Sequence, residues 1–187
     1  DGTLTHPEHD FPYIRQQLDI PEQADILEHL ASLDREEAAR KHQWLYEHEY
    51  ELAASAEIAP GAQELIQALH DKQCQLAILT RNDQALAQVT LKAIGLECFF
   101  TEATILGREQ AIPKPHPDGL RRIAEQWQVA PTQLIMVGDF HFDLSCARAA
   151  GAKSVLILES GNPWPELSDV YAPNCHALLN QIRSCYG

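Results

Sequence analysis

The amino-acid sequence predicts an α/β fold: a parallel sheet with helices on both faces, and a small all-helical cap inserted near the start. Two observations carry this prediction. After residue 60, short continuous apolar runs alternate with segments of helical periodicity, the pattern of parallel strands buried on both faces. Residues 5–58 show no strand pattern. We therefore divide the chain into a core domain, residues 1–4 and 59–187, and a helical cap domain, residues 5–58.

Helix-start signals divide the cap into a bundle of about three or four helices. Ile20-Pro21-Glu22 places a proline near the first position of a helix that continues to Leu30. Asp34 is an N-cap candidate for a long helix over about 35–56, whose first turn holds acidic residues that the helix dipole favours. Pro60-Gly61 marks the return to the core.

In the core, apolar spacing predicts the helices and apolar runs predict the strands. The helix after Gly61 has apolar residues at i, i+3, i+4 and i+7. Ligands of parallel sheets bind at the carboxyl ends of the strands, and Thr80 and Asp139 stand at two such ends. Beyond this first helix, we expect strands over 76–80, 103–106, 134–138 and 154–158, and helices over 83–94, 117–128, 142–150 and 176–185.

The composition excludes several classes of function. A net charge of −13 argues against a nucleic-acid partner, because neutralising phosphates requires clustered Lys and Arg. No apolar run reaches membrane-spanning length, so we expect no membrane partner. The five cysteines are odd in number and lack a Cys-x-x-Cys spacing. We therefore expect free thiols in a reducing compartment, the cytoplasm. The sequence does not indicate an oligomeric state.

Four motifs along the chain carry the chemistry. They are Asp1-Gly2-Thr3-Leu4; the strand Leu76–Leu79 with Thr80-Arg81-Asn82; Lys114 between two prolines; and the strand Leu134–Gly138 with Asp139 and Asp143. In this order they resemble the motifs of the haloacid dehalogenase-like (HAD) hydrolases, which have a Rossmann-like fold. A small helical cap between the first two motifs resembles the phosphoglycolate phosphatase-like branch of that family.

The resemblance implies a Mg²⁺-dependent phosphatase that hydrolyses a small phosphate monoester, phosphoglycolate-like or a sugar phosphate, through an aspartyl phosphate. Asp1 matches the family's general acid/base, and its main-chain carbonyl would be a metal ligand. Asp139 would bind Mg²⁺, and Asp143 would hold a metal-bound water or orient its neighbours. Lys114 would supply positive charge to phosphoryl oxygens, and Thr80 would donate a hydroxyl hydrogen bond to one of them.

Further substrate contacts are expected close to these motifs and in the cap. Arg81 and Asn82 follow Thr80, and either contact the substrate or shape the loop. Arg15 is the only Lys or Arg in the first thirty residues of the cap, and it or Arg81 is a candidate to pair with a substrate carboxylate or phosphate. The cap holds 13 acidic and 4 basic residues. It would therefore not attract anionic substrates over long range, and we expect specificity from short-range contacts.

Two other functions compete with the phosphatase. Asp1 favours phosphoryl transfer over dehalogenation, but a sugar-phosphate mutase of the same superfamily remains an alternative. A non-catalytic binding or scaffold protein is the alternative of another class, because the family pattern places the nucleophile two positions before Asp1. We expect the strand that carries it to lie upstream as well. A chain truncated at Asp1 would then be inactive and poorly stable, since neighbouring strands would lose a ladder partner.

Overall fold

Five short strands in two parallel sheets form the centre of the described part of the molecule. The structure is a computed structural model that describes residues 1–6 and 10–186, without the side chains of residues 185 and 186. β1 (Ile78–Leu79) pairs with β2 (Ile105–Leu106). β3 (Ile135–Gly138) pairs with β4 (Lys153–Ile157), which also pairs with β5 (Val170–Ala172). The predicted α/β class is thus observed, with the sheet divided in two. Within the described residues no ladder joins β1 to β3.

Helices cover both faces of the three-stranded sheet. Met136 of β3 packs into a cluster with α6 and α7, and Val137 packs on the other side with α4 and α8. This alternation follows from the two-residue period of a strand. Both faces are therefore buried, as the continuous apolar runs predicted. The four helices are α4 (Ala62–Asp71), α6 (Asp118–Trp127), α7 (His141–Ala150) and α8 (Cys175–Tyr186).

The two-stranded sheet shares a helix with its neighbour. α6 reaches Leu79 of β1 because Gly119 has no side chain, and a Cβ at Gly119 would lie 2.4 Å from Leu79 Cδ1. On the other face α5 (Gln84–Ala93) packs Leu91 against Ile105. α6 thus connects the layers over both sheets. Three 3₁₀ turns complete the core: η1 (Glu97–Phe99), η2 (Glu102–Thr104) and η3 (Pro131–Gln133).

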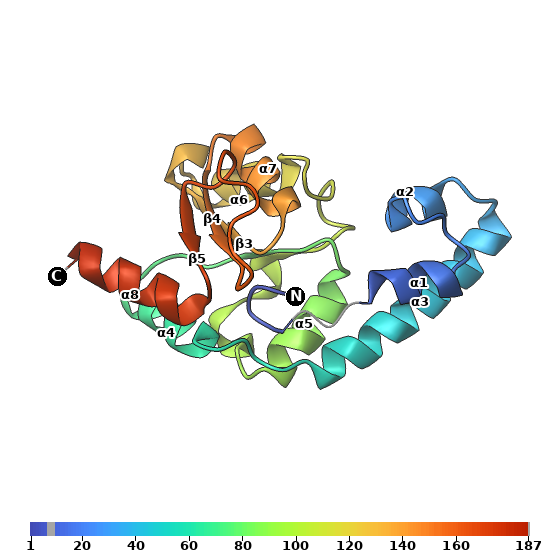
Figure 1. Cartoon of the computed structure of the whole chain (residues 1–187), viewed down its shortest axis with the longest axis horizontal. Coiled ribbons are helices and arrows are strands. Elements are labelled where there is room, and N and C mark those ends of the chain that lie inside the picture. Colours follow the sequence, from blue (N-terminus) through green and yellow to red (C-terminus); the bar gives the residue numbers. More distant parts are fainter. Residues whose placement is uncertain (7–9, 187) are drawn as a thin grey trace.

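The cap region contains helices only, α1 (Phe11–Gln17), α2 (Ile26–Ala31) and α3 (Arg35–Ser55), within its described residues. Figure 1 shows these helices to one side of the sheets. They enclose an apolar cluster of their own, which includes Leu30 and Leu45. α3 is capped by Asp34 as predicted. The helix expected to start at Pro21 starts instead at Ile26, because the Asp25 carboxylate accepts hydrogen bonds from Leu27 N and Glu28 N.

The chain enters and leaves the cap along one short antiparallel pairing. Thr5 and Ile58 form a β-bridge. His6 N donates to Glu57 O at 3.1 Å, and Ala59 N donates to Leu4 O at 2.8 Å. Residues 7–9 of the cap and the side chain of Cys185 lie outside the described residues. In the described part of the chain, no helix has the length and apolar character needed to cross a membrane.

Candidate active site

The first residues of the chain lie against Asp139, the residue that directly follows β3. Thr3 Oγ1 donates to Asp139 Oδ1 at 2.8 Å. Gly2 has a φ of +75°, and a Cβ at this position would lie 2.3 Å from Asp139 Oδ2. Only glycine meets both conditions without strain. The conformation of the Asp1-Gly2-Thr3 segment therefore places its main chain next to one carboxylate oxygen of Asp139 and its hydroxyl next to the other.

Asp143 connects the start of α7 to the Lys114 loop. Its Oδ1 lies 2.6 Å from Lys114 Nζ, and both side chains are largely buried. Its Oδ2 accepts a hydrogen bond from Phe140 N at 3.0 Å, which caps the helix. Gly138 makes room for this side chain, since a Cβ there would lie 2.2 Å from Asp143 Cγ. Each oxygen of Asp143 thus has a fixed partner, and the Lys114 ammonium is held in place.

The charged groups around Asp139 act on one another. Burial, and then the Asp143 carboxylate, raise the pKa of Asp139, while the Thr3 hydrogen bond and Lys114 oppose this shift. Two neighbouring carboxylates in a partly buried place favour a cation between them.

Cys146 lies beneath the Lys114 loop and adds no charge to the site. Its thiol donates to His116 O at 3.2 Å. Burial raises the pKa of this thiol to about 11, so it is neutral at pH 7. Cys146 is one of four free cysteines whose side chains the structure describes. Its position and protonation give it a packing role under the loop that carries Lys114.

The loop after β1 carries Thr80, Arg81 and Asn82. Thr80 Oγ1 accepts a hydrogen bond from Asn82 N at 3.0 Å, and Thr80 N donates to Leu106 O at 2.9 Å. Asn82 is buried, and its side-chain oxygen accepts from Asp83 N. Asn82 therefore shapes the loop through its side chain, while the Thr80 hydroxyl keeps its hydrogen available for a further partner.

Arg81 links this loop to three other segments. One guanidinium nitrogen donates to Lys114 O at 2.7 Å, and another pairs with Asp25 Oδ2 of the cap. The guanidinium carbon lies 4.5 Å from the centroid of the Phe142 ring, within the range of a cation–π contact. The second and third motifs of the sequence thus meet through the Arg81 side chain.

Arg15 is not part of this cluster. Its Nε and Nη2 both donate to Ala24 O at 3.3 Å, within the cap. The structure thus brings four predicted residues together and attaches the Thr80–Asn82 loop to them through Arg81. The four are Asp1, Lys114, Asp139 and Asp143. Among the described residues no three His, Cys, Asp or Glu side chains form a group that could hold a metal ion.

Sequence reasoning missed several residues that connect the site. Thr3 belongs to the first motif, but its hydroxyl bond to Asp139 was not expected. Asp25 and the Glu49–Arg108 pair, 3.2 Å apart, join the cap to the core. Asp25 carries only a helix-cap signal in the sequence, which is common and says nothing of a partner 56 positions away.

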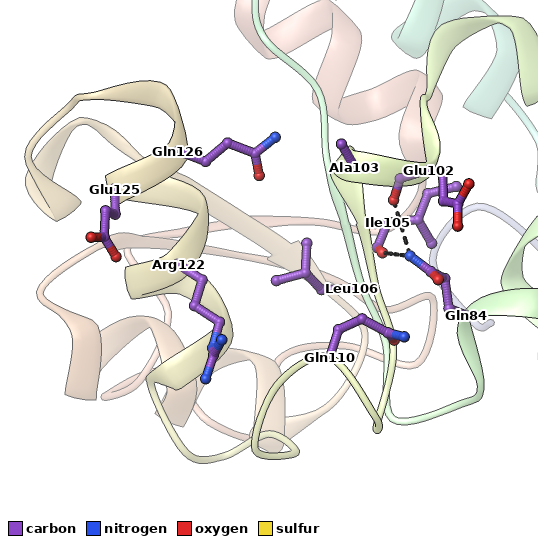
Figure 2. A pocket seen from close by; sticks show the side chains of 9 residues that line it. All are labelled: Gln84, Glu102, Ala103, Ile105, Leu106, Gln110, Arg122, Glu125 and Gln126. Atoms are coloured by element: carbon purple, nitrogen blue, oxygen red, sulfur yellow. Dashed lines mark hydrogen bonds between the residues drawn. The ribbon is translucent and has the colours of Figure 1, made fainter.

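A surface groove lies apart from these residues. Figure 2 shows Arg122, Glu125 and Gln126 of α6 on one side of it and the η2 segment on the other. Gln84 closes one end, because its amide donates to Glu102 O and Ile105 O. None of the predicted site residues lines this groove. Amide and charged side chains line this groove together with Ile105 and Leu106 of β2.

Known proteins resemble this chain in sequence and in fold. A family model described as haloacid dehalogenase-like hydrolase matches residues 1–151. A haloacid dehalogenase-like hydrolase domain-containing protein of Arabidopsis thaliana is 32% identical over 178 residues, 89% of this chain and 71% of that protein. Phosphoglycolate phosphatase of Escherichia coli is 30% identical over 129 residues, 68% of this chain, and the match spans 50% of that enzyme. A crystal structure of a hydrolase from Pseudomonas syringae has the same fold, with a TM-score of 0.74 at 24% identity over 98% of this chain and 94% of that one.

Proposed function

The chain belongs to the haloacid dehalogenase-like hydrolases, and from this premise we propose that the complete protein is a phosphatase acting on a small phosphate monoester. The observation that carries the proposal is the meeting of Asp139, Asp143 and Lys114 with the Asp1-Gly2-Thr3 segment after β3. The similarity to phosphoglycolate phosphatase supports the same substrate class, phosphoglycolate-like or a sugar phosphate.

Phosphoryl transfer needs positive charge and hydrogen-bond donors around three phosphoryl oxygens. Lys114 supplies the charge, and its ion pair with Asp143 fixes the ammonium before the substrate arrives. Thr80 supplies a donor, because its oxygen already accepts from Asn82 N while its hydrogen remains available. Both groups follow or face the carboxyl ends of strands, where a phosphate would enter.

Proton transfer is assigned to Asp1. The carboxylate nucleophile, which the family pattern places two positions before Asp1, attacks phosphorus and releases the alcohol oxygen, leaving an aspartyl phosphate. Asp1 protonates the departing oxygen and then takes a proton from the water that hydrolyses the intermediate.

The donor set suits Mg²⁺, although three carboxylates do not converge. Mg²⁺ takes oxygen ligands, keeps several waters and shares the substrate phosphate, so one or two carboxylates suffice. Asp139 would hold it with the Asp1 carbonyl, and Asp143 through a water. The raised pKa of Asp139 beside Asp143 marks a place where a cation is favoured. When bound, Mg²⁺ would offset the repulsion between phosphate and carboxylates.

Phosphate release by the complete protein tests the proposal. We expect release from a panel that includes 2-phosphoglycolate and sugar phosphates, and loss of release in EDTA. Asp139→Ala should lower kcat by roughly 10²-fold or more, and Asp71→Ala, which removes an exposed carboxylate at the end of α4, should leave kcat unchanged. Activity that survives EDTA or Asp139→Ala would overturn the mechanism.

The alternative functions have their own signatures in the same assay. Conversion of one sugar phosphate into its isomer without free phosphate, followed by phosphorus NMR, would favour the mutase. No turnover of any ester would favour the binding or scaffold protein. Arg81 and Arg15 remain candidate substrate ligands, and a substrate anion would have to displace Asp25 to reach Arg81.

A further inference from the structure

The Arg81 side chain joins the cap to two segments of the core. Its contacts on the core are the Lys114 carbonyl and the Phe142 ring. Its contact on the cap is Asp25, and the two side chains are each 27% exposed. A charge pair that is this far removed from water is screened less than one on the surface. The position of the cap can therefore act on Arg81 through Asp25.

Asp25 uses its two carboxylate oxygens for different purposes. Oδ1 accepts from Leu27 N at 3.0 Å and from Glu28 N at 3.2 Å, so it caps α2 and is fixed to the cap. Oδ2 is left for Arg81. The geometry of α2 thus determines where the negative charge is placed, which is beside the Arg81 guanidinium.

A second ion pair reaches the same loop. Arg108 pairs with Glu49 of α3 at 3.2 Å, with both side chains at most 15% exposed. The main-chain nitrogen of Arg108 donates to Asn82 O at 2.9 Å. Both ion pairs therefore reach residues 80–82, and the Asp25 pair continues through Arg81 to the Lys114 carbonyl.

We propose that Asp25 is a positioning residue, which holds Arg81 in the orientation that fixes the Lys114 loop when the cap lies over the site. Without Asp25, Arg81 keeps its core partners but loses the charge that orients its second nitrogen. The Lys114 main chain then gains freedom, and its ammonium is less well placed for the phosphoryl group. The kinetic part of this inference rests on the proposed phosphatase function; the structural part does not.

Asp25→Asn in the complete protein isolates the charge pair, because Asn caps helices about as well as Asp. The matched control is Asp34→Asn. Asp34 caps α3 with the same pair of bonds, to Glu36 N at 3.0 Å and Glu37 N at 3.1 Å. No ion pair to Asp34 is found among the residues that the structure describes. Both variants remove one negative charge at the start of a helix, and of the two substituted residues Asp25 is the one that pairs with Arg81.

Two measurements are needed. In Asp25→Asn, kcat should fall about fivefold, the rate equivalent of a partly screened ion pair, with a smaller change in KM. Hydrogen exchange at the three amides of this segment, Ile112, Lys114 and His116, should rise in the same variant, whether or not a substrate is known. In Asp34→Asn both readings should match those of the parent protein. Arg81→Gln combined with Asp25→Asn should be no worse than Arg81→Gln alone, since the two changes break one interaction.

Unchanged exchange at residues 112–116 in Asp25→Asn would overturn the inference, as would an equal rise in Asp34→Asn. Additive effects of Asp25→Asn and Arg81→Gln would do the same. If the parent protein releases no phosphate from any ester, the proposed function fails while the exchange experiment still decides the role of Asp25. A kcat loss without an exchange difference would also count against it, because the coupling to the Lys114 loop would be missing.

Discussion

At the scale of single residues, Gly2 shows how closely the first motif and Asp139 depend on each other. Its left-handed backbone and its missing side chain are both required, the first by the turn and the second by the Asp139 carboxylate. The Thr3 hydroxyl donates a hydrogen bond to one oxygen of that carboxylate, and the other oxygen lies next to the Gly2 main chain. Changes at Gly2 should therefore affect chemistry as well as folding.

Gly2→Ala should lower kcat of the complete protein at least tenfold, because a Cβ 2.3 Å from Asp139 Oδ2 forces that carboxylate to move. It should also cost about 1–2 kcal/mol of stability for the left-handed backbone. The control is Gly95→Ala, where φ is +71° and nothing lies within 4 Å of the added methyl group. We expect the same loss of stability there, measured by thermal unfolding, with an unchanged kcat. Equal activity in both variants would show that the Asp139 contact is unimportant.

The residues of the site differ in how far the sequence predicts their surroundings. Thr80 and Asp139 are predictable at strand ends because an apolar run and the residue after it are adjacent in the chain. The contacts of Arg81 are not, since its partners lie 33 and 56 positions away. No local pattern records which carboxylate will meet which guanidinium. Such pairs are decided by the packing of helices that the sequence places only approximately.

At the scale of elements, a polar junction joins β4 to β5. Ser154 is fully buried on β4, and Asp169 precedes β5. Asp169 Oδ2 accepts from Ser154 N at 2.9 Å, and Asp169 Oδ1 lies 3.3 Å from Arg148. The bond from Ser154 N lowers the pKa of Asp169, and Arg148 adds to the shift. The folded chain therefore stabilises the ionised Asp169 carboxylate relative to its protonated form.

Asp169→Asn should lower the free energy of unfolding at pH 7 by about 1 kcal/mol, because Asn keeps an acceptor for Ser154 N but loses the charge. A lowered pKa contributes stability above the ordinary Asp range, and that stability is lost as the pH falls through the folded pKa. The difference between the variant and the parent should thus shrink below about pH 4. Urea unfolding at several pH values measures it. Ser168→Ala is the uncharged control, because the Ser168 hydroxyl bonds Asn162 and Trp164 O and not the Asp169 carboxylate. Its cost should not vary with pH, and an equal pH trend in both variants would contradict the assignment.

The elements themselves were predicted with uneven success, for physical reasons. Helices with a clear apolar stripe, such as α4 and α6, begin and end close to the predicted residues. β1 is shorter than the predicted strand 76–80, because its only partner within the described residues is the two-residue β2. β5 was missed, since Val170–Ala172 is only three residues long, too short to predict a strand, and it pairs with β4 in the folded chain.

At the scale of the whole molecule, the excess negative charge of the cap meets basic residues of the core. The cap carries 13 acidic and 4 basic residues, and two of its carboxylates bind core arginines, Asp25 with Arg81 and Glu49 with Arg108. Among the described residues, the apolar cluster of the cap shares no member with the clusters around the sheets, although α3 also packs against α5 of the core. The division of the chain at residues 5–58 predicts that the two parts lose structure separately.

Leu30→Ala tests this division. Leu30 is fully buried within the cap cluster, and its truncation should cost about 2–5 kcal/mol there. Hydrogen exchange should rise in α1–α3 and stay near the parent values in α4–α8. Leu144→Ala is the counterpart, an equally buried leucine on α7, and it should raise exchange throughout the core. A uniform rise in Leu30→Ala would mean that cap and core form one cooperative unit.

The narrow pairing at Thr5 and Ile58 has an evolutionary consequence. The two chain segments of such a bridge lie about 5 Å apart. The chain therefore leaves the core and returns to it at neighbouring points, with the spacing of the two strands of a β-hairpin. For the chain connection alone, an insert between these two positions needs to satisfy only that spacing. A lineage can therefore exchange or lengthen the insert without breaking the strands of the core, and the contacts that it must keep are those of Asp25 and Glu49 with the core arginines.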